Sequence, residues 1–302
     1  SDWDEKVFST YASFLDGYND EQKKAIVSPA SRILTVAGAG SGKTSVLVKR
    51  IEFLVKHRGV DPEEILAITF TRKARSEMER RLSSVGVEGV QISTFNAFSE
   101  KLLREYGREF YGRKMRVLTY ADKHLALNLA LYHHNLEIDD VIDTYFSQSM
   151  KRMKTKQQLH NIFLNDCFSL IDYFTTTKTS LYDFSKNTDP EYRDMASLVY
   201  KIVTYILDHK HAQGLRSFSD QLTDCVSLLK KRPAIIPYFS HVLVDEYQDV
   251  NSVQVELLTL LNVENVFAVG DPRQAIYGWR GRDMKFMLDF ETSFGETETI
   301  HV

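Results

Sequence analysis

Residues 37–44, which read AGAGSGKT, have the types and spacing of a phosphate-binding loop. They follow a β-branched run at 32–36 and precede an amphipathic stretch at 45–55, so a strand, a glycine loop and a helix are expected in that order. Glycine lets backbone N–H groups ring a polyphosphate at the positive end of a helix. A lysine and a threonine at the helix start can reach the phosphates and Mg²⁺. The residues expected to bind the nucleotide here are Ala37, Gly38, Ala39, Gly40, Ser41, Gly42, Lys43 and Thr44.

An acidic pair ends a second apolar run. Residues 241–249 read HVLVDEYQD, which places Asp245 and Glu246 at the carboxyl end of a buried strand, where ligands bind in open parallel sheets. We expect Asp245 and Thr44 to hold Mg²⁺, and Glu246 to accept a proton from a water that attacks a γ phosphate. Helix capping would account for Asp249 but not for the pair. The sequence therefore predicts a nucleotide hydrolase in which Lys43 and Glu246 are catalytic.

Composition is that of an ordinary globular chain: of its 302 residues, 43% are hydrophobic and 26% charged. The net charge of −3 gives no global signal for nucleic acid, so a basic binding surface must be local. Two cysteines without CxxC spacing argue against a disulfide framework or a zinc site. No apolar run approaches the ~20 residues of a membrane helix, and the start of the chain is acidic, unlike a signal peptide. We expect a cytoplasmic protein with no membrane partner, nucleoid-associated if prokaryotic.

Glycine and proline divide the chain into two kinds of segment. None of the 14 glycines lies between Gly112 and Gly214, and Pro190 is the only proline there, which favours helices. Outside that interval, short β-branched runs occur at 33–36, 65–70, 90–94, 242–244 and 266–269. Continuous apolar strands separated by helical stretches indicate a parallel sheet covered on both faces. The expected fold class is α/β: a P-loop domain with a parallel sheet, interrupted by an all-α insertion.

Five blocks in order resemble the UvrD/Rep/PcrA family of superfamily 1 DNA helicases. AxxGxGKT, with alanine where the strict Walker A motif has glycine, is followed by DEYQD and then by residues 269–281, VGDPRQAIYGWRG. Residues 18–22 resemble the Q motif, which implies that Gln22 reads the adenine edge; its amide can both accept and donate a hydrogen bond. Residues 68–78 and 92–98 resemble motifs Ia and Ib. The resemblance implies a RecA-like fold and ATP with Mg²⁺ as cofactors.

The resemblance also implies a single-stranded DNA path beside the nucleotide. Aromatic faces for bases and cations for phosphates suit such a strand. The residues it places there are Phe70, Thr71, Arg72, Thr94, Asn96, Tyr277, Trp279 and Arg280. Core packing is an equally good reading for Phe70. Relatives commonly have histidine at Asn96 and a small residue at Arg75. Gln274 would contact the γ phosphate and link hydrolysis to the DNA residues that follow it.

Basic residues of the helical insertion are a further candidate surface, since relatives place this domain beside the duplex junction. Around residues 101–116, Lys101, Arg104, Arg108, Arg113, Lys114 and Arg116 outnumber Glu105 and Glu109. A second run contains Lys151, Arg152, Lys154 and Lys156. Solubilising helix faces are an equally good interpretation of each residue taken singly.

The function implied is an ATP-dependent 3′–5′ single-stranded DNA translocase and helicase that acts on single-strand/duplex junctions in repair or replication restart. We expect residues 1–104 and 215–302 to form domain 1A and residues 105–214 to form domain 1B. Motif IV and the later family arginines are not matched, so an N-terminal half without domains 2A and 2B is expected, nearly inactive alone. The alternatives are the helicase part of a RecB/AddA-like helicase–nuclease and a non-motor P-loop scaffold that binds DNA.

Overall fold

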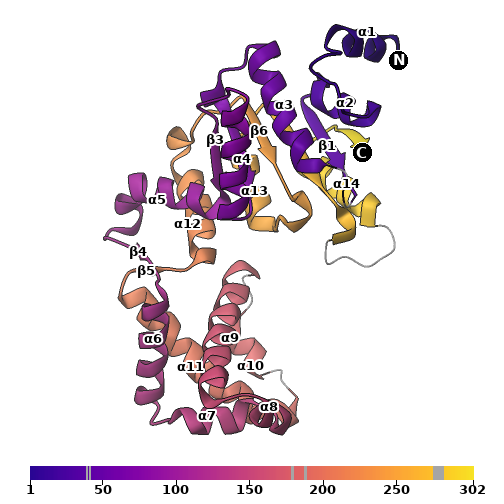
Figure 1. The fold of residues 1–302 in the computed structure, drawn as a ribbon. Helices are drawn as coiled ribbons and strands as arrows, with labels where there is room; N and C mark the ends of the chain where they lie inside the picture. The colour runs from indigo at the N-terminus through magenta and orange to yellow at the C-terminus, as the bar shows by residue number, and fades with distance from the viewer. Residues whose placement is uncertain (39, 41, 178–179, 187–188, 275–281) are drawn as a thin grey trace. The chain divides into compact units, whose positions relative to one another are not determined.

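The computed structural model describes residues 1–302 except 39, 41, 178–179, 187–188 and 275–281. The chain forms two compact units, residues 1–99 with 229–302 and residues 100–228 (Figure 1). The expected interruption of an α/β fold by a helical insertion is confirmed. The second unit extends beyond the expected range 105–214 because two helices, α5 (Phe95–Tyr111) and α12 (Phe218–Lys231), continue through the junctions, where no loop marks the boundary.

A parallel sheet is the framework of the first unit. In the described part of that unit it has six strands in the order β3-β2-β6-β7-β1-β8, and every neighbouring pair is parallel. The strands are β1 Arg32–Val36, β2 Ile65–Thr69, β3 Gln91–Thr94, β6 His241–Val244, β7 Asn265–Gly270 and β8 Glu298–His301. The five expected strands are confirmed to within one residue. The edge strand β8 was not expected, because its sequence, ETIH, contains a single buried apolar residue, Ile300.

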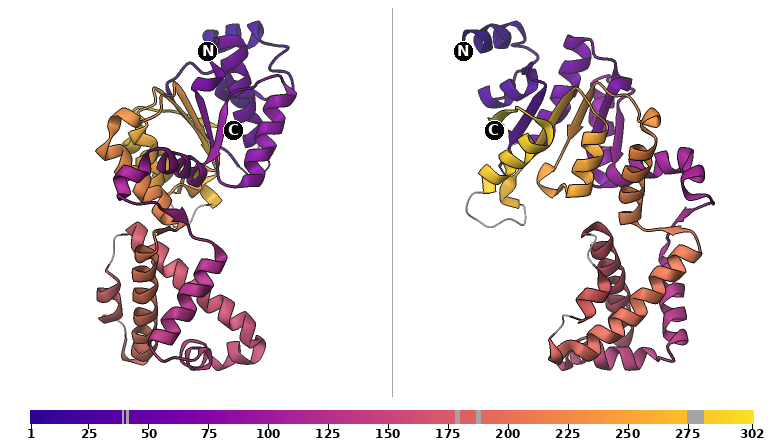
Figure 2. Two further views of the ribbon diagram at one scale, coloured as in Figure 1. Left: turned by 90° about the vertical axis from the view of Figure 1, so that its left-hand side faces the viewer. Right: turned by 180° about the vertical axis from the view of Figure 1, so that it is seen from behind.

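Both faces of this sheet are buried, as continuous apolar strands require. Side chains alternate along a strand, so neighbouring residues point to opposite faces. On β1, for example, Ile33 belongs to a core shared with α2, α3 and α4, and the next residue, Leu34, is also fully buried. Figure 2 shows the indigo and purple helices on one side of the sheet and the orange and yellow helices on the other. The sheet is thus held rigidly from both sides.

The helices of the first unit are α1 Asp2–Thr10, α2 Asp20–Val27, α3 Lys43–Arg58, α4 Arg72–Ser84, α13 Ser252–Leu260 and α14 Arg282–Phe294. Short 3-10 turns lie at η1 Pro62–Glu64, η3 Pro233–Ile235, η4 Tyr247–Asp249 and η5 Pro272–Gln274. Tyr247 of η4 packs its ring against Phe286 and Phe290 of α14, with centroids 5.7 and 5.3 Å apart. This aromatic contact holds the turn that follows β6 in place.

In the residues that the structure describes, the second unit is helical apart from one short pair of strands. Its own helical elements are α6 Tyr120–His133, α7 Ile138–Tyr145, α8 Gln148–Met153, α9 Lys156–Thr177, α10 Leu181–Lys186, η2 Pro190–Tyr192 and α11 Arg193–Ala212. The strands β4 (Arg116–Val117) and β5 (Leu215–Arg216) pair in parallel, which the all-α expectation did not include. A core from α6, α7, α9 and α11 contains Cys167, which is a free thiol.

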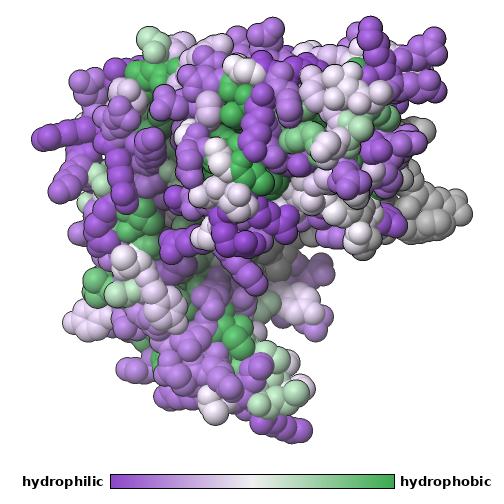
Figure 3. All heavy atoms as spheres, turned by 45° about the horizontal axis from the view of Figure 1, so that its top comes forward, coloured by the Kyte–Doolittle hydropathy of each residue, from purple (hydrophilic) through white to green (hydrophobic). Residues whose placement is uncertain are grey.

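Hydrophilic side chains cover most of the surface in Figure 3, with narrow strips of hydrophobic residues between them. Within the residues the structure describes, none of the helices combines the length and the apolar character that a membrane span requires.

His241, at the start of β6, makes folding sensitive to acid. Burial, reinforced by Arg50 and Arg58, lowers the pKa of His241 from 6.5 to about 4. Between these two pKa values, His241 is largely protonated in the unfolded chain and largely neutral in the folded chain. The stability is fully present above the unfolded pKa and declines as the pH falls from 6.5 towards 4.

We expect His241→Gln to flatten this pH dependence. Between about pH 7.5 and about pH 4.5, the wild type should lose about 2 kcal/mol more unfolding free energy than the variant, a figure reduced because the imidazole is partly exposed. Urea unfolding at both pH values measures the difference, with His133→Gln, at an exposed position, as the control. Parallel pH profiles for the wild type and His241→Gln would contradict the assignment.

Candidate functional site

The glycine loop lies between β1 and α3, at the carboxyl edge of the sheet. The N–H of Ala37 donates to the carbonyl of Gly270 (2.9 Å), which ties the loop to β7. Gly42 precedes the helix with φ of 70°, a left-handed conformation that favours glycine. The φ angle of Gly40 is also positive, at 73°. This backbone directs the first N–H groups of a 16-residue helix into the loop, where an anion is favoured. Ala39 and Ser41 lie outside the described residues.

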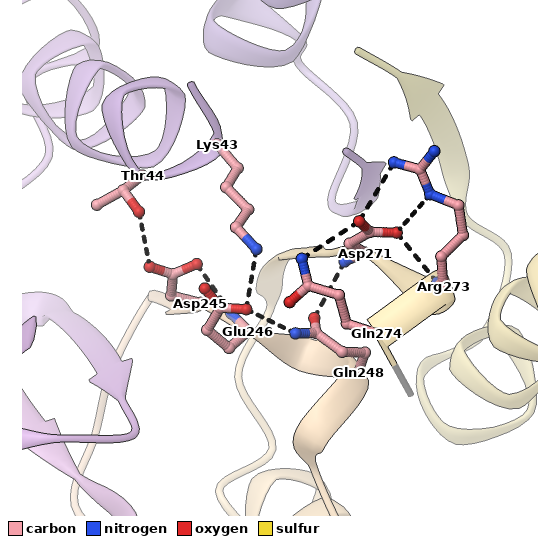
Figure 4. A network of polar contacts seen from close by, with 8 residues as sticks. All are labelled: Lys43, Thr44, Asp245, Glu246, Gln248, Asp271, Arg273 and Gln274. Carbon is pink, nitrogen blue, oxygen red and sulfur yellow. Dashed lines mark hydrogen bonds and ion pairs between the residues drawn. The ribbon is translucent and has the colours of Figure 1, made fainter. Parts of the chain in front are cut away.

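The loop and the acidic pair meet directly (Figure 4). The Lys43 ammonium donates to Glu246 Oε2 at 2.9 Å, and the Thr44 hydroxyl donates to Asp245 Oδ2 at 3.2 Å. These residues are about two hundred positions apart in sequence, and the parallel order β6-β7-β1 brings them together. The structure therefore places the four residues expected to do chemistry in one cluster.

The two acids differ in environment, as different tasks require. Burial, and secondly the charge of Glu246, raise the pKa of Asp245, which is 5% exposed. Glu246 has a left-handed backbone, with φ of 51° and ψ of 43°, a conformation that costs a non-glycine residue about 1–2 kcal/mol. Its N–H donates to Asp245 Oδ1 at 2.8 Å, which stabilises the tight turn. The turn points both carboxylates towards α3 (Figure 4).

Gln248 connects the acidic pair to the end of β7. Its amide nitrogen donates to Glu246 Oε2 at 2.6 Å, and its amide oxygen accepts from the N–H of Asp271 at 3.0 Å. Asp271 in turn accepts from the Gln274 amide at 3.4 Å. A side chain at Gly270 would collide, since a Cβ there would lie 2.6 Å from Gln248 Oε1. The structure thus joins Glu246 to Gln274 through two intermediate residues.

Arg273, in the turn η5 that follows β7, lies beside the glycine loop. Its guanidinium donates to Asp271 at 3.0 Å, and a Cβ added to Gly38 would lie 2.5 Å from its Nη2. A cation at this position faces the space where phosphates bind in a loop of this kind. A glycine is therefore required at position 38 for a second physical reason, because any side chain there would collide with the Arg273 guanidinium.

Gln22 lies beside the loop and is held in a defined orientation. Its backbone N–H and side-chain oxygen form a capping box with Asn19 at the start of α2, with bonds of 2.9 and 3.0 Å. A Cβ on Gly42 would be 3.7 Å from the Gln22 amide nitrogen. The capping bond uses one of the two lone pairs of the amide oxygen.

The oxygen atoms present fit a magnesium ion better than a zinc ion. Thr44 Oγ1 and Asp245 Oδ2 lie 3.2 Å apart, close to the ~2.9 Å between neighbouring ligands of an octahedral Mg²⁺ with bonds of about 2.05 Å. Among the residues the structure describes, no group of three or more histidine, cysteine or acidic residues could hold a metal. One carboxylate, one hydroxyl and the phosphates of a nucleotide are a usual magnesium set.

Five of the eight residues expected to contact DNA lie at or just after the ends of the neighbouring strands β2 and β3. Phe70 follows β2, is half-buried and packs its ring against Phe95 at 5.7 Å. The hydroxyls of Thr71 and Thr94 cap α4 and α5, accepting from Ala74 (3.0 Å) and Ala97 (3.1 Å). Arg72 is exposed on the first turn of α4, and Asn96 is half-buried on the first turn of α5. Tyr277, Trp279 and Arg280 lie outside the described residues.

A family model described as the UvrD/REP helicase N-terminal domain matches residues 18–295. The chain belongs to this family. Two similar proteins are named ATP-dependent DNA helicase PcrA. The one from Staphylococcus epidermidis strain RP62A is 32% identical over 298 residues, and the one from Staphylococcus aureus strain Mu50 is 30% identical over the same length. Each match covers 95% of this chain and 38% of the relative, so the chain spans about two fifths of the length of these proteins.

One residue of this UvrD-family site had no signal in the sequence. Arg50 of α3 is 4% exposed, and its Nη1 donates to the carbonyls of Ala25, Ile26 and Ser28 at 3.0–3.1 Å. Burial lowers the pKa of Arg50 to about 9, a value still high enough for the guanidinium to be charged at neutral pH. A cation at these carbonyls also opposes the negative end of α2. Arg50 therefore fastens α2, which carries Gln22, to the helix that carries Lys43 and Thr44.

We expect Arg50→Met to lower the unfolding free energy by about 3 kcal/mol, because it leaves several buried carbonyls without their donor. Urea denaturation measures this loss. Lys56→Met, which removes an exposed cation from the same helix, is the matched control and should cost less than about 0.5 kcal/mol. Equal losses in the two variants would show that Arg50 does not anchor α2.

Proposed function

We propose that this chain is the ATP-binding part of a DNA helicase that translocates 3′–5′ on single-stranded DNA. It would act at single-strand/duplex junctions in repair or replication restart, with ATP and Mg²⁺ as cofactors. The first unit corresponds to domain 1A and the second to domain 1B. The observation that carries the proposal is the paired contact of Lys43 with Glu246 and of Thr44 with Asp245 at one edge of the sheet.

Nucleotide binding exchanges the partner of Lys43. Its ammonium, now on Glu246, moves to the β and γ phosphates, where a cation offsets more negative charge. Glu246 then loses a neutralising partner and becomes a stronger proton acceptor. Thr44 and Asp245 would hold Mg²⁺, which supplies charge neutralisation at the phosphates.

Hydrolysis follows from this arrangement. Glu246 takes a proton from a water molecule as the water oxygen bonds to the γ phosphorus. The bond from that phosphorus to the bridging oxygen breaks, and ADP leaves with the electron pair. Lys43 and Arg273 offset the charge that develops on the phosphate oxygens. Gln22 orients the adenine ring through its amide.

Coupling to DNA would run through Gln248, Asp271 and Gln274. The chain of hydrogen bonds from Glu246 to Gln274 changes when Glu246 releases Lys43. Gln274 directly precedes the segment that contains Tyr277 and Trp279. A contact that differs between two nucleotide states is what coupling between two ligands requires.

We expect Lys43→Ala to abolish binding of a fluorescent ATP analogue with Mg²⁺. Glu246→Gln should retain binding within about threefold but lower single-turnover hydrolysis about 10²- to 10⁴-fold, because it removes the general base. The matched control is Glu291→Gln, an exposed position on α14, which should change neither quantity. The rate for the 302-residue chain is expected to be low, so phosphate release is followed at excess enzyme. Normal hydrolysis by Glu246→Gln would refute this assignment.

We expect Gln274→Ala to uncouple the two ligands while each still binds. In the wild type, a non-hydrolysable ATP analogue should change the affinity for an oligothymidylate about 5- to 150-fold. In the variant this factor should approach one, with each separate affinity within about threefold of the wild type. Fluorescence anisotropy with and without the analogue gives the factor. Full coupling in Gln274→Ala would exclude a role for this residue as the link.

A further inference from the structure

A pair of hydroxyl groups joins the segment before α2 to the first turn of α3. The Tyr18 and Ser45 hydroxyl oxygens lie 3.0 Å apart, a hydrogen bond between residues 27 positions apart in sequence. Both side chains are half-buried. Ser45 is the third residue of α3, two positions after Lys43. The bond therefore ties Tyr18 to the part of the helix that follows the glycine loop directly.

Tyr18 is also connected to the amide of Gln22. It directly precedes Asn19, whose N–H donates to Gln22 Oε1 at 3.0 Å and whose side chain accepts from the Gln22 N–H at 2.9 Å. The N–H of Tyr18 itself donates to the carbonyl of Leu15, a fully buried residue, at 3.2 Å. The place of residue 18 therefore sets where the capping box begins. A shift of Tyr18 would move the Asn19 N–H that orients the Gln22 amide.

The two ends of α2 are thus fastened to the same helix by separate contacts. Arg50 of α3 holds the carbonyls at the end of α2. The bond between Tyr18 and Ser45 holds the segment that enters α2. Because both contacts reach α3, Gln22 keeps a fixed spacing from Lys43 at the start of that helix. A ligand that carries a base at one end and phosphates at the other is bound more tightly when its two subsites are held ready at that spacing.

Core packing alone does not require the hydroxyl of Tyr18. The rings of Tyr11 and Tyr18 both pack against the core shared by α2, α3 and α4. Tyr11 makes an edge contact with Phe53 at 5.1 Å, and within the described residues its hydroxyl has no hydrogen bond. A phenylalanine would fill either place. The hydroxyl at residue 18 therefore has a different task from that at residue 11.

We propose that the hydroxyl pair of Tyr18 and Ser45 is a positioning element that sets the base selectivity of the nucleotide site. It holds the capping box, and so the Gln22 amide, in the place where that amide reads the adenine edge. A site built to bond the adenine amino group discriminates against a purine with a carbonyl there. The inference rests on the proposed function, because it takes ATP as the ligand and Gln22 as the residue that reads the base.

The test separates the base from the phosphates. Tyr18→Phe keeps the ring and removes the hydroxyl, Ser45→Ala removes its partner, and Tyr11→Phe is the matched control. ATP, inosine triphosphate and inorganic tripolyphosphate, each with Mg²⁺, compete with a fluorescent ATP analogue on the 302-residue chain. The affinity of the analogue itself is first measured for each variant. Circular dichroism melting checks that the variants fold.

We expect the wild type to prefer ATP to inosine triphosphate. Tyr18→Phe should lower the affinity for ATP about fivefold, the usual effect of one lost hydrogen bond, and should narrow that preference by a similar factor. Tripolyphosphate affinity should change less than about twofold, as should every affinity in Tyr11→Phe. Ser45→Ala should match Tyr18→Phe. The double variant should also lose about fivefold rather than about 25-fold, because both changes remove the same bond.

Equal losses for ATP and tripolyphosphate in Tyr18→Phe would overturn the inference, since they would indicate damage to the glycine loop. Effects of Tyr18→Phe and Ser45→Ala that multiply in the double variant would also overturn it. Binding of ATP by the wild type with an unchanged affinity in Tyr18→Phe would overturn this inference alone. Failure of the wild type to bind ATP would overturn the proposed function, and this inference with it.

Discussion

The ion pair between Lys43 and Glu246 is the contact on which the site depends. It joins the start of α3 to the end of β6, and a parallel sheet is what makes it possible, because all its strands end at the same edge. β7 lies between β1 and β6 and holds the glycine loop through the bond from Ala37 to Gly270. The same strand therefore sets the distance between the cation and the acid and supplies Asp271 beside them.

This ion pair also explains how the site is stable before a nucleotide arrives. A half-buried ammonium and two adjacent carboxylates are costly unless each has a partner. Here Lys43 and Gln248 both donate to Glu246, and Thr44 donates to Asp245, so the acids are satisfied by groups that can be released. In the proposed function, a bound phosphate would replace one partner of Lys43 by another rather than create a new cluster. That exchange would give the nucleotide a direct way to alter Gln248.

Local sequence was enough to predict the glycine loop, the acidic pair and five strands, because each is encoded within a few neighbouring residues. The contacts that join these pieces were not predictable in the same way. Arg50 lies in an ordinary helical pattern, and its role depends on the carbonyls at the end of α2, which only the folded structure brings next to it. β8 was missed because an edge strand needs little apolar sequence. The basic runs could be counted, but ion pairing with Asp122, Asp139 and Asp143 depends on the fold.

The close packing around Gly270 restricts how a movement of Glu246 can be passed on to the residues around it. Gln248 is 7% exposed, and the space that a side chain at Gly270 would fill is occupied by its amide oxygen and by Phe286. A buried amide in such a space has few alternative orientations that satisfy both its donor and its acceptor. If Glu246 moves, Gln248 must either move with it or lose the hydrogen bond to Glu246. A movement of Gln248 changes the bond that its amide oxygen accepts from the N–H of Asp271. In the proposed function, tight packing would therefore turn a change of partner at Lys43 into a displacement of the residues that lead to Gln274.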